Sequence, residues 1–111
     1  MTLLGDYIAS VVRLYQTGLA TEVSLRQVLV DFLQSVDALQ KFTIINEPKR
    51  IECGAPDIVL LQRDNVPVAY IETKDIGDTD LRGEKQNKEQ FSRYKQGLNC
   101  VVFTDFLRFL L

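Results

Sequence analysis

Apolar residues in the first third of the chain recur at helical spacing. The first group, which Gly18 follows as a natural stop, is Leu4, Ile8, Val11, Val12 and Tyr15. The second forms one stripe of Leu25, Val28, Leu29, Phe32, Leu33 and Val36. Ser24 and Gln27 have the spacing of a capping box at its start. The pattern predicts two amphipathic helices, and the face of the second helix expected in solvent carries Arg26, Asp31, Gln34 and Asp37.

The pattern becomes strand-like at residues 42–46, and Pro48 ends this run. Two further apolar runs, 57–63 and 66–74, flank Asp64 and Asn65. These two residues tolerate positive φ and favour a two-residue hairpin turn. The first arm of the hairpin is apolar on both faces, so we expect it in the middle of a covered sheet.

The last third of the chain combines one helix with two strand-like runs. A polar loop is expected at 75–83, a charged helix at 84–97, a buried strand at 100–104 and a final strand at 106–111. A helix between two strands is typical of a right-handed crossover with parallel pairing. We therefore predict one α/β domain over residues 1–111, with a mixed sheet flanked by helices. The abrupt apolar end suggests a fragment of a longer polypeptide.

Three charged residues close the predicted hairpin. A turn centred on Asp64 and Asn65 would place Asp57 directly opposite Glu72, with Cβ atoms about 5 Å apart. Lys74 lies two residues beyond Glu72 and points to the same face. The alternative is a solvated strand end, because acid–base pairs occur on many exposed strands. The combination of two acids and an ammonium in register favours a metal site for phosphodiester hydrolysis.

Composition narrows the chemistry that such a site can perform. Histidine is absent, which excludes Ser-His and Cys-His catalysis, and two cysteines are too few for a structural zinc site. Carboxylates, lysine and an oxygen-ligated metal such as Mg²⁺ remain. The net charge of −2 and pI near 5.1 argue against a free-standing, high-affinity nucleic-acid binder. No apolar stretch approaches the length of a membrane span, and nothing resembles an export signal. Cys53 and Cys100 are expected as buried thiols in a reducing compartment.

Phosphodiester hydrolysis requires an activated water and neutralisation of the charge on the phosphate. Asp57, Glu72 and the carbonyl oxygen of Thr73 are the predicted metal ligands. Lys74 is predicted to hold the attacking water and to stabilise the charge that develops on the phosphorane.

Gly54-Ala55-Pro56-Asp57 followed by Glu72-Thr73-Lys74 resembles the signature of the PD-(D/E)xK nuclease superfamily. The resemblance implies a restriction-endonuclease-like core, a mixed sheet with flanking helices. Gln90-Phe91-Ser92-Arg93-Tyr94 is similar to the Gln-x-x-x-Tyr pattern of RecB-like members, which implies that Gln90 lies near the metal or the scissile phosphate. Tyr94 is a candidate DNA contact, with core packing as the alternative. Glu22 is a candidate metal ligand, with a favourable interaction with the helix dipole as the alternative.

A closer resemblance covers nearly the whole chain. The segments that carry it are Thr21-Glu22-x-Ser24-x-Arg26, Asn46-Glu47-Pro48-Lys49-Arg50, Gly54-Ala55-Pro56-Asp57, Ile71-Glu72-Thr73-Lys74-Asp75-Ile76-Gly77, Glu89-Gln90-Phe91-x-Arg93-Tyr94 and Thr104-Asp105. Together they resemble the N-terminal, RecB/Mrr-like nuclease domain of single-chain type I-like or type IIG restriction-modification enzymes. The resemblance implies a prokaryotic, cytoplasmic enzyme that acts on double-stranded DNA with Mg²⁺, for which Mn²⁺ substitutes. An adenine methyltransferase, and in some members a helicase, would lie in the same polypeptide, and a second copy would be needed to cut both strands.

Arg26, Lys49 and Arg50 are candidate phosphate contacts by position alone. Their alternative is a solvated positive surface or an ion pair with Glu47. The function favoured by these observations is a Mg²⁺-dependent DNA endonuclease. Two alternatives stay open: an inactive nuclease-fold domain that binds DNA or docks onto a partner, and a nuclease of the repair or resolvase type.

Overall fold

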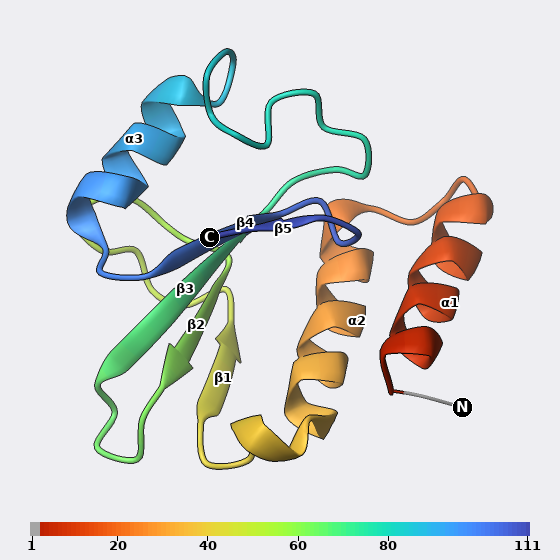
Figure 1. Cartoon of the computed structure of the whole chain (residues 1–111), viewed down its shortest axis with the longest axis horizontal. Helices are drawn as coiled ribbons and strands as arrows, with labels where there is room; N and C mark the ends of the chain where they lie inside the picture. Colours follow the sequence, from red (N-terminus) through yellow and green to blue (C-terminus); the bar gives the residue numbers. More distant parts are fainter. Residues whose placement is uncertain (1–2) are drawn as a thin grey trace.

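The computed structural model describes residues 3–111 as five strands, three α-helices and one short 3₁₀-helix (Figure 1). The chain begins with α1 (Leu3–Gln16), α2 (Glu22–Ser35) and the 3₁₀-helix η1 (Asp37–Leu39). The hairpin region follows as β1 (Thr43–Asn46), β2 (Ile58–Leu61) and β3 (Pro67–Thr73). The chain continues with α3 (Lys88–Gly97), β4 (Val101–Thr104) and β5 (Phe109–Leu110). Within residues 3–111, no helix is long and apolar enough to cross a membrane.

The strands form one mixed sheet in the order β1-β2-β3-β4-β5. β3 and β4 pair in parallel across the α3 connection, and the other neighbours pair antiparallel. The predicted α/β class is therefore confirmed, and the architecture is compatible with a restriction-endonuclease-like core. β2 lies inside the sheet, as its doubly apolar pattern predicts.

Two apolar clusters divide the core. One packs α1 and α2 against β2 and β3, and its buried members are Tyr7, Val11, Leu25, Leu29, Val30, Ile58, Leu60, Ile71 and Phe106. The other packs α3 against β4 and consists of Leu81, Phe91, Tyr94, Val101 and Phe103. Figure 1 shows α1 and α2 on one side of the sheet and α3 on the other. This arrangement leaves the ends of β2 and β3 between the two helical layers.

The second helix begins earlier than its apolar stripe suggests. Thr21 is the N-cap, and its hydroxyl accepts a hydrogen bond from the Ser24 backbone while the Ser24 hydroxyl accepts one from the Thr21 backbone. The predicted pairing of Ser24 with Gln27 is therefore wrong by three residues, because Ser24 is the N3 residue that closes the box and not the N-cap that opens it. The shift places Glu22 at the first helical position.

Two expectations about helix faces are also corrected. Most of the apolar stripe on α1 points outward: Ile8, Val12 and Tyr15 are exposed, and Tyr7 and Val11 supply the buried contact with α2. Arg26 was expected in solvent but is buried on α2. A helical wheel separates apolar from polar positions, but it does not show that carboxylates from other elements surround Arg26.

The hairpin register is correct at the site although the predicted turn is wrong. Asn65 has φ 64, Asn65 N donates to Gln62 O at 2.9 Å, and Gln62 N donates to Val66 O at 2.9 Å. These contacts define a three-residue loop, which alone would shift the pairing by one residue. A bulge between Leu60 and Leu61 restores it, so that Leu60 pairs with Ala69 and Ile58 with Ile71.

The helix α3 begins at Lys88 and not at residue 84. The carboxylate of Asp80 accepts backbone N–H groups from Glu84, Lys85 and Asn87 at 2.7–2.8 Å, which holds this segment in a turn. Local competition from an aspartate side chain thus delays the helix.

The final run is interrupted, contrary to the predicted strand at 106–111. Phe106 has φ 78 and is fully buried, and the Thr104 hydroxyl accepts from Phe106 N and donates to Arg108 O. Burying this aromatic ring requires a tight turn, which reduces the strand to Phe109–Leu110.

Candidate active site

Asp57 and the end of β3 meet where β2 begins. Asp57 Oδ2 accepts two hydrogen bonds from Thr73, one from the backbone N and one from the hydroxyl, both 2.8 Å long. The adjacent pair of the ladder is Ile58 with Ile71, so Asp57 lies opposite Glu72 at the position that the hairpin pattern predicts. The hydrogen bond from the Thr73 hydroxyl to Asp57 was not predicted. The sequence indicates it only through the position of Thr73 between Glu72 and Lys74.

Glu72 is the most buried carboxylate of the predicted site, with 4% of its surface exposed. Its Oε2 accepts a 3.1 Å hydrogen bond from Gln90 Nε2, while its buried Oε1 has no hydrogen-bond partner among the described residues. Burial and the neighbouring charge of Asp57 raise the pKa of Glu72 to about 8, although Lys74 acts in the opposite direction. The two oxygens of Glu72 therefore differ, because Oε2 contacts Gln90 and Oε1 has no hydrogen-bond donor among residues 3–111.

Lys74 lies at the edge of this acidic pair. Its Nζ donates a 2.8 Å hydrogen bond to Gln90 Oε1 and lies 3.9 Å from Glu72 Oε2. The ammonium also lies 5.6 Å from the centre of the Phe91 ring, a cation–π distance. Its backbone N–H donates to Thr104 O at 2.8 Å, which fixes the start of the side chain. Lys74 is thus held from three sides.

Gln90 connects the lysine and the glutamate from the first turns of α3. Its two amide atoms contact Lys74 and Glu72, which are separate partners on β3 and just beyond it. The structure therefore brings together all four residues predicted to be catalytic, Asp57, Glu72, Lys74 and Gln90.

Tyr94 is buried in the core, with 2% of its surface exposed. A Cβ added to Gly54, which has φ 138, would lie 2.8 Å from Tyr94 Cε1. The glycine before Asp57 thus permits close approach of α3, a link between two motifs that the sequence reasoning treated separately. Burial and the charge of Glu72 raise the pKa of Tyr94, despite opposing contacts with Gln90 and Ala55. Packing, the alternative considered for Tyr94, is the environment that the structure shows.

Arg26 lies on the Asp57 side of the site. Its side chain forms ion pairs with Glu22 at 3.0 Å, Glu47 at 3.1 Å and Asp57 at 3.2 Å. The ion pair with Glu47 is the alternative considered for this residue, and the participation of Glu22 and Asp57 was not anticipated. Lys49 and Arg50 are exposed in the connection from β1 to β2, and neither forms an ion pair with any residue of the described range 3–111.

The oxygen donors fit a hard divalent cation. Among residues 3–111, no cluster of three or more His, Cys, Asp or Glu side chains is arranged to hold a metal. Asp57 and Glu72 form a carboxylate pair, and the buried, unpartnered Oε1 of Glu72 is the atom that a cation would satisfy. Two carboxylates with a main-chain carbonyl suffice for Mg²⁺, which usually retains several waters. Glu22 approaches the pair from α2, and burial and the charge of Asp57 raise its pKa while Arg26 lowers it.

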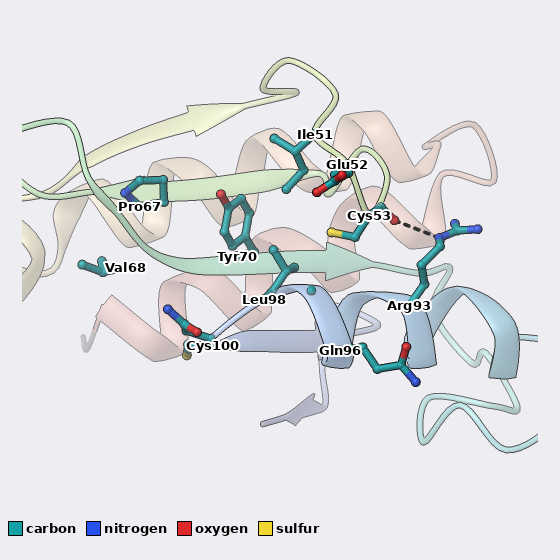
Figure 2. Close-up of a pocket in the computed structure, with 12 residues that line it drawn as sticks. Ile51, Glu52, Cys53, Pro67, Val68, Tyr70, Arg93, Gln96, Leu98 and Cys100 are labelled. Atoms are coloured by element: carbon teal, nitrogen blue, oxygen red, sulfur yellow. Dashed lines mark hydrogen bonds between the residues drawn. The ribbon is translucent and has the colours of Figure 1, made fainter.

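A separate cavity of about 580 Å³ lies between the end of α3, the start of β4 and the connection from β1 to β2. Figure 2 shows Cys53 and Cys100 on its wall, with the Arg93 side chain hydrogen-bonded to Cys53 O. Both thiols are free and half-buried, which is less than their predicted full burial. None of the four predicted catalytic residues lines this cavity, so its volume says nothing about the carboxylate site.

Comparison with solved structures identifies the same fold in a DNA-bound protein. The chain is similar to the protein in the cryo-EM structure of a DrdV–DNA complex, with a TM-score of 0.70 and 20% sequence identity. The alignment covers 92% of this chain and 72% of the other chain. No family model and no curated protein matches the sequence. At this identity the comparison shows the fold alone.

Proposed function

We propose that this chain is a metal-dependent nuclease domain that hydrolyses phosphodiester bonds in DNA. One observation carries the proposal: Glu72 is buried beside Asp57 with one oxygen that has no hydrogen-bond partner within residues 3–111, and Gln90 connects it to Lys74. A solvated strand end would not bury this acid or position an amide between the acid and the ammonium. Perturbed ionisable groups in such an arrangement are typical of functional sites.

Asp57, Glu72 and the Thr73 carbonyl would hold the cation, with Glu22 as a further candidate ligand. Bound Mg²⁺, or Mn²⁺ in its place, supplies charge neutralisation and a more acidic water. The Thr73 N–H and hydroxyl orient Asp57 by binding one of its oxygens. Gln90 orients Glu72 in the same way.

Lys74 has three N–H donors, and Gln90 engages one of them. The remaining donors are suited to orient the attacking water and to stabilise negative charge on the phosphoryl oxygens. Gln90 keeps the ammonium in place by accepting from it while donating to Glu72. This division of work assigns nucleophile positioning to Lys74 and cation binding to the carboxylates.

DNA as the substrate is supported by the fold shared with a protein bound to DNA and by the exposed basic residues Lys49 and Arg50. Because the net charge is −2, we propose that these contacts supplement binding by other parts of a longer restriction-modification polypeptide. An adenine methyltransferase is the proposed companion, with a helicase as a second candidate, and a second copy would cut the opposite strand. Sequencing the coding DNA downstream of Leu111 tests whether these companion domains are present.

The test of the nuclease is nicking of supercoiled plasmid by the purified 111-residue chain at high concentration, with Mg²⁺, with Mn²⁺ and with EDTA. We expect nicking with either metal, little sequence preference, and none with EDTA. Asp57→Asn, Glu72→Gln and Lys74→Met should each reduce nicking by at least about 100-fold, the scale for loss of one group that stabilises the transition state.

The matched control is Lys41→Met. Lys41 is exposed just before β1, whose start pairs with the end of β2, so it lies at the sheet end away from Asp57. This variant should nick like the parent. If the three site variants also nick like the parent, the proposed function is wrong. Metal-independent DNA binding without any nicking would favour the inactive DNA-binding alternative.

A further inference from the structure

One nitrogen of Arg26 bridges two carboxylates of the proposed nuclease site. NH2 lies 3.0 Å from Glu22 Oε2 and 3.2 Å from Asp57 Oδ1, while NH1 contacts Glu47 at 3.1 Å. The arginine is 5% exposed, and its buried Nε has no hydrogen-bond partner among residues 3–111. The guanidinium therefore contacts these three acids inside the protein and does not form part of an exposed basic surface.

The third partner, Glu47, has an uncommon backbone conformation. It is one of the non-glycine residues at positive φ, with φ 56, and its N–H donates a 2.7 Å hydrogen bond to Asp57 O. This conformation is disfavoured for a residue with a Cβ, and it persists where the surroundings impose it. Here it brings the Glu47 carboxylate to Arg26 and ties the loop to the backbone of Asp57. The contacts of Arg26 thus come from its own helix α2 and from both ends of the connection between β1 and β2.

Asp57 lies between two acids whose environments differ. Its charge acts on both Glu72 and Glu22. On the Glu72 side, the buried Oε1 has no hydrogen-bond partner in the part of the chain that the structure describes. On the Glu22 side, a nitrogen of Arg26 lies between the two carboxylates, where a second cation would have to bind.

We propose that Arg26 is an internal cation that permanently fills the second cation position, so that the site takes one divalent metal, between Asp57 and Glu72. This inference rests on the proposed function. A guanidinium remains protonated in proteins, and removing a buried cation from its partners is costly. A second Mg²⁺ would have to displace this nitrogen of Arg26 from Glu22 and Asp57. Arg26 is therefore a positioning residue that sets the number of metals.

The test counts Mn²⁺ bound by the 111-residue chain without DNA, from the electron paramagnetic resonance signal of free Mn²⁺. Ions that also bind to an Asp57→Asn, Glu72→Gln double variant are subtracted as background. The parent should bind one ion. Arg26→Met, which keeps a long side chain without charge, should bind two, and Arg26→Lys should return the count to one. Adding Glu22→Gln to Arg26→Met should also return it to one, because the second ion then loses a ligand.

A merely structural role for Arg26 would change thermal stability without changing the metal count of the folded chain. Circular dichroism identifies the folded variants. A count of one in folded Arg26→Met overturns the inference. If that variant does not fold, the Mn²⁺ count of the parent chain is the test. A parent that binds two ions overturns the inference and leaves the proposed function unaffected. No ion at all overturns the metal site itself, and with it the proposed function.

Discussion

Lys74 Nζ and Gln90 Oε1 are joined by a 2.8 Å hydrogen bond between the end of β3 and the start of α3. The Gln90 amide also donates a 3.1 Å hydrogen bond to Glu72. One side chain therefore sets the position of Lys74, which is proposed to orient the water, relative to Glu72, the proposed metal ligand. A glutamine is suited to this role because it is a neutral donor and acceptor. It connects the two groups without adding charge to an already acidic cluster.

Gln90→Leu should preserve the fold and reduce the nicking rate about 10- to 100-fold, the range for loss of a residue that orients a metal ligand. The physical reason is that Glu72 and Lys74 then lose their common partner. The rate is measured in the plasmid assay at saturating Mg²⁺. Gln96→Leu, on an exposed position of the same helix, is the control and should leave the rate unchanged. Equal rates for the two variants would remove Gln90 from the machinery.

Glu72 should make metal-free stability depend on pH. Its pKa of about 8 in the folded chain exceeds the unfolded value of about 4.3. The contribution of Glu72 to the stability is therefore fully present below about pH 4.3 and is lost as the pH rises through 8. In EDTA, Glu72→Gln should be more stable than the parent at pH 8.5 by a few kcal/mol, since one pKa unit is about 1.4 kcal/mol. Urea unfolding at pH 4 and pH 8.5 measures this, and an equal difference at both values contradicts it.

Asp80 should act in the opposite direction. Burial raises the pKa of its carboxyl, but backbone N–H groups of Asn87, Glu84 and Lys85 lower it more, and the net result lies below the usual range. Its contribution is present above the unfolded pKa and is lost as the pH falls through the folded one. Asp80→Asn should lower the melting temperature by several degrees at pH 7 and less at pH 3. Glu84→Gln, an exposed acid in the same loop, should show no such difference.

Tyr7 ties α1 to the C-terminal turn. Its hydroxyl donates a buried 2.6 Å hydrogen bond to Phe106 O, across a separation of 99 residues. Tyr7→Phe leaves that carbonyl unpaired and should reduce the free energy of unfolding by about 1–3 kcal/mol. Tyr15→Phe on the same helix is the control, because Tyr15 is exposed and its loss should cost little. Chemical denaturation of both variants compares them, and similar values would contradict the assigned contact.

Gly54 and Gly77 offer a matched pair of substitutions. Both have positive φ, but an added Cβ would lie 2.8 Å from Tyr94 at Gly54 and would meet nothing within 4 Å at Gly77. Gly54→Ala should therefore cost about 1–3 kcal/mol more than Gly77→Ala, the usual range for overpacking. It should also reduce nicking, because the displaced loop carries Asp57. An equal loss of stability would show that backbone strain alone governs both positions.

Much of the fold follows from local patterns. The strand and helix periods predict the mixed sheet, and the hairpin pattern places Asp57 opposite Glu72. The predicted two-residue turn between β2 and β3 is nevertheless wrong, because the loop has three residues. The register at the site is still correct, because a bulge in β2 offsets the extra loop residue. The start of α3 was misplaced because Asp80 competes for its first N–H groups. Such errors arise where a side chain or an inserted residue changes a backbone pattern that periodicity alone does not contain.

By itself, the sequence determined that two acids and a lysine lie together, because one hairpin carries all three and strand geometry fixes their faces. Only the tertiary structure decided what surrounds them. Gln90 reaches Lys74 and Glu72 because α3 packs on the sheet, and Arg26 meets Asp57 because α2 packs on the other face. These contacts join elements far apart in the chain, and their geometry depends on how whole helices dock. No local pattern of apolar and polar residues specifies that docking.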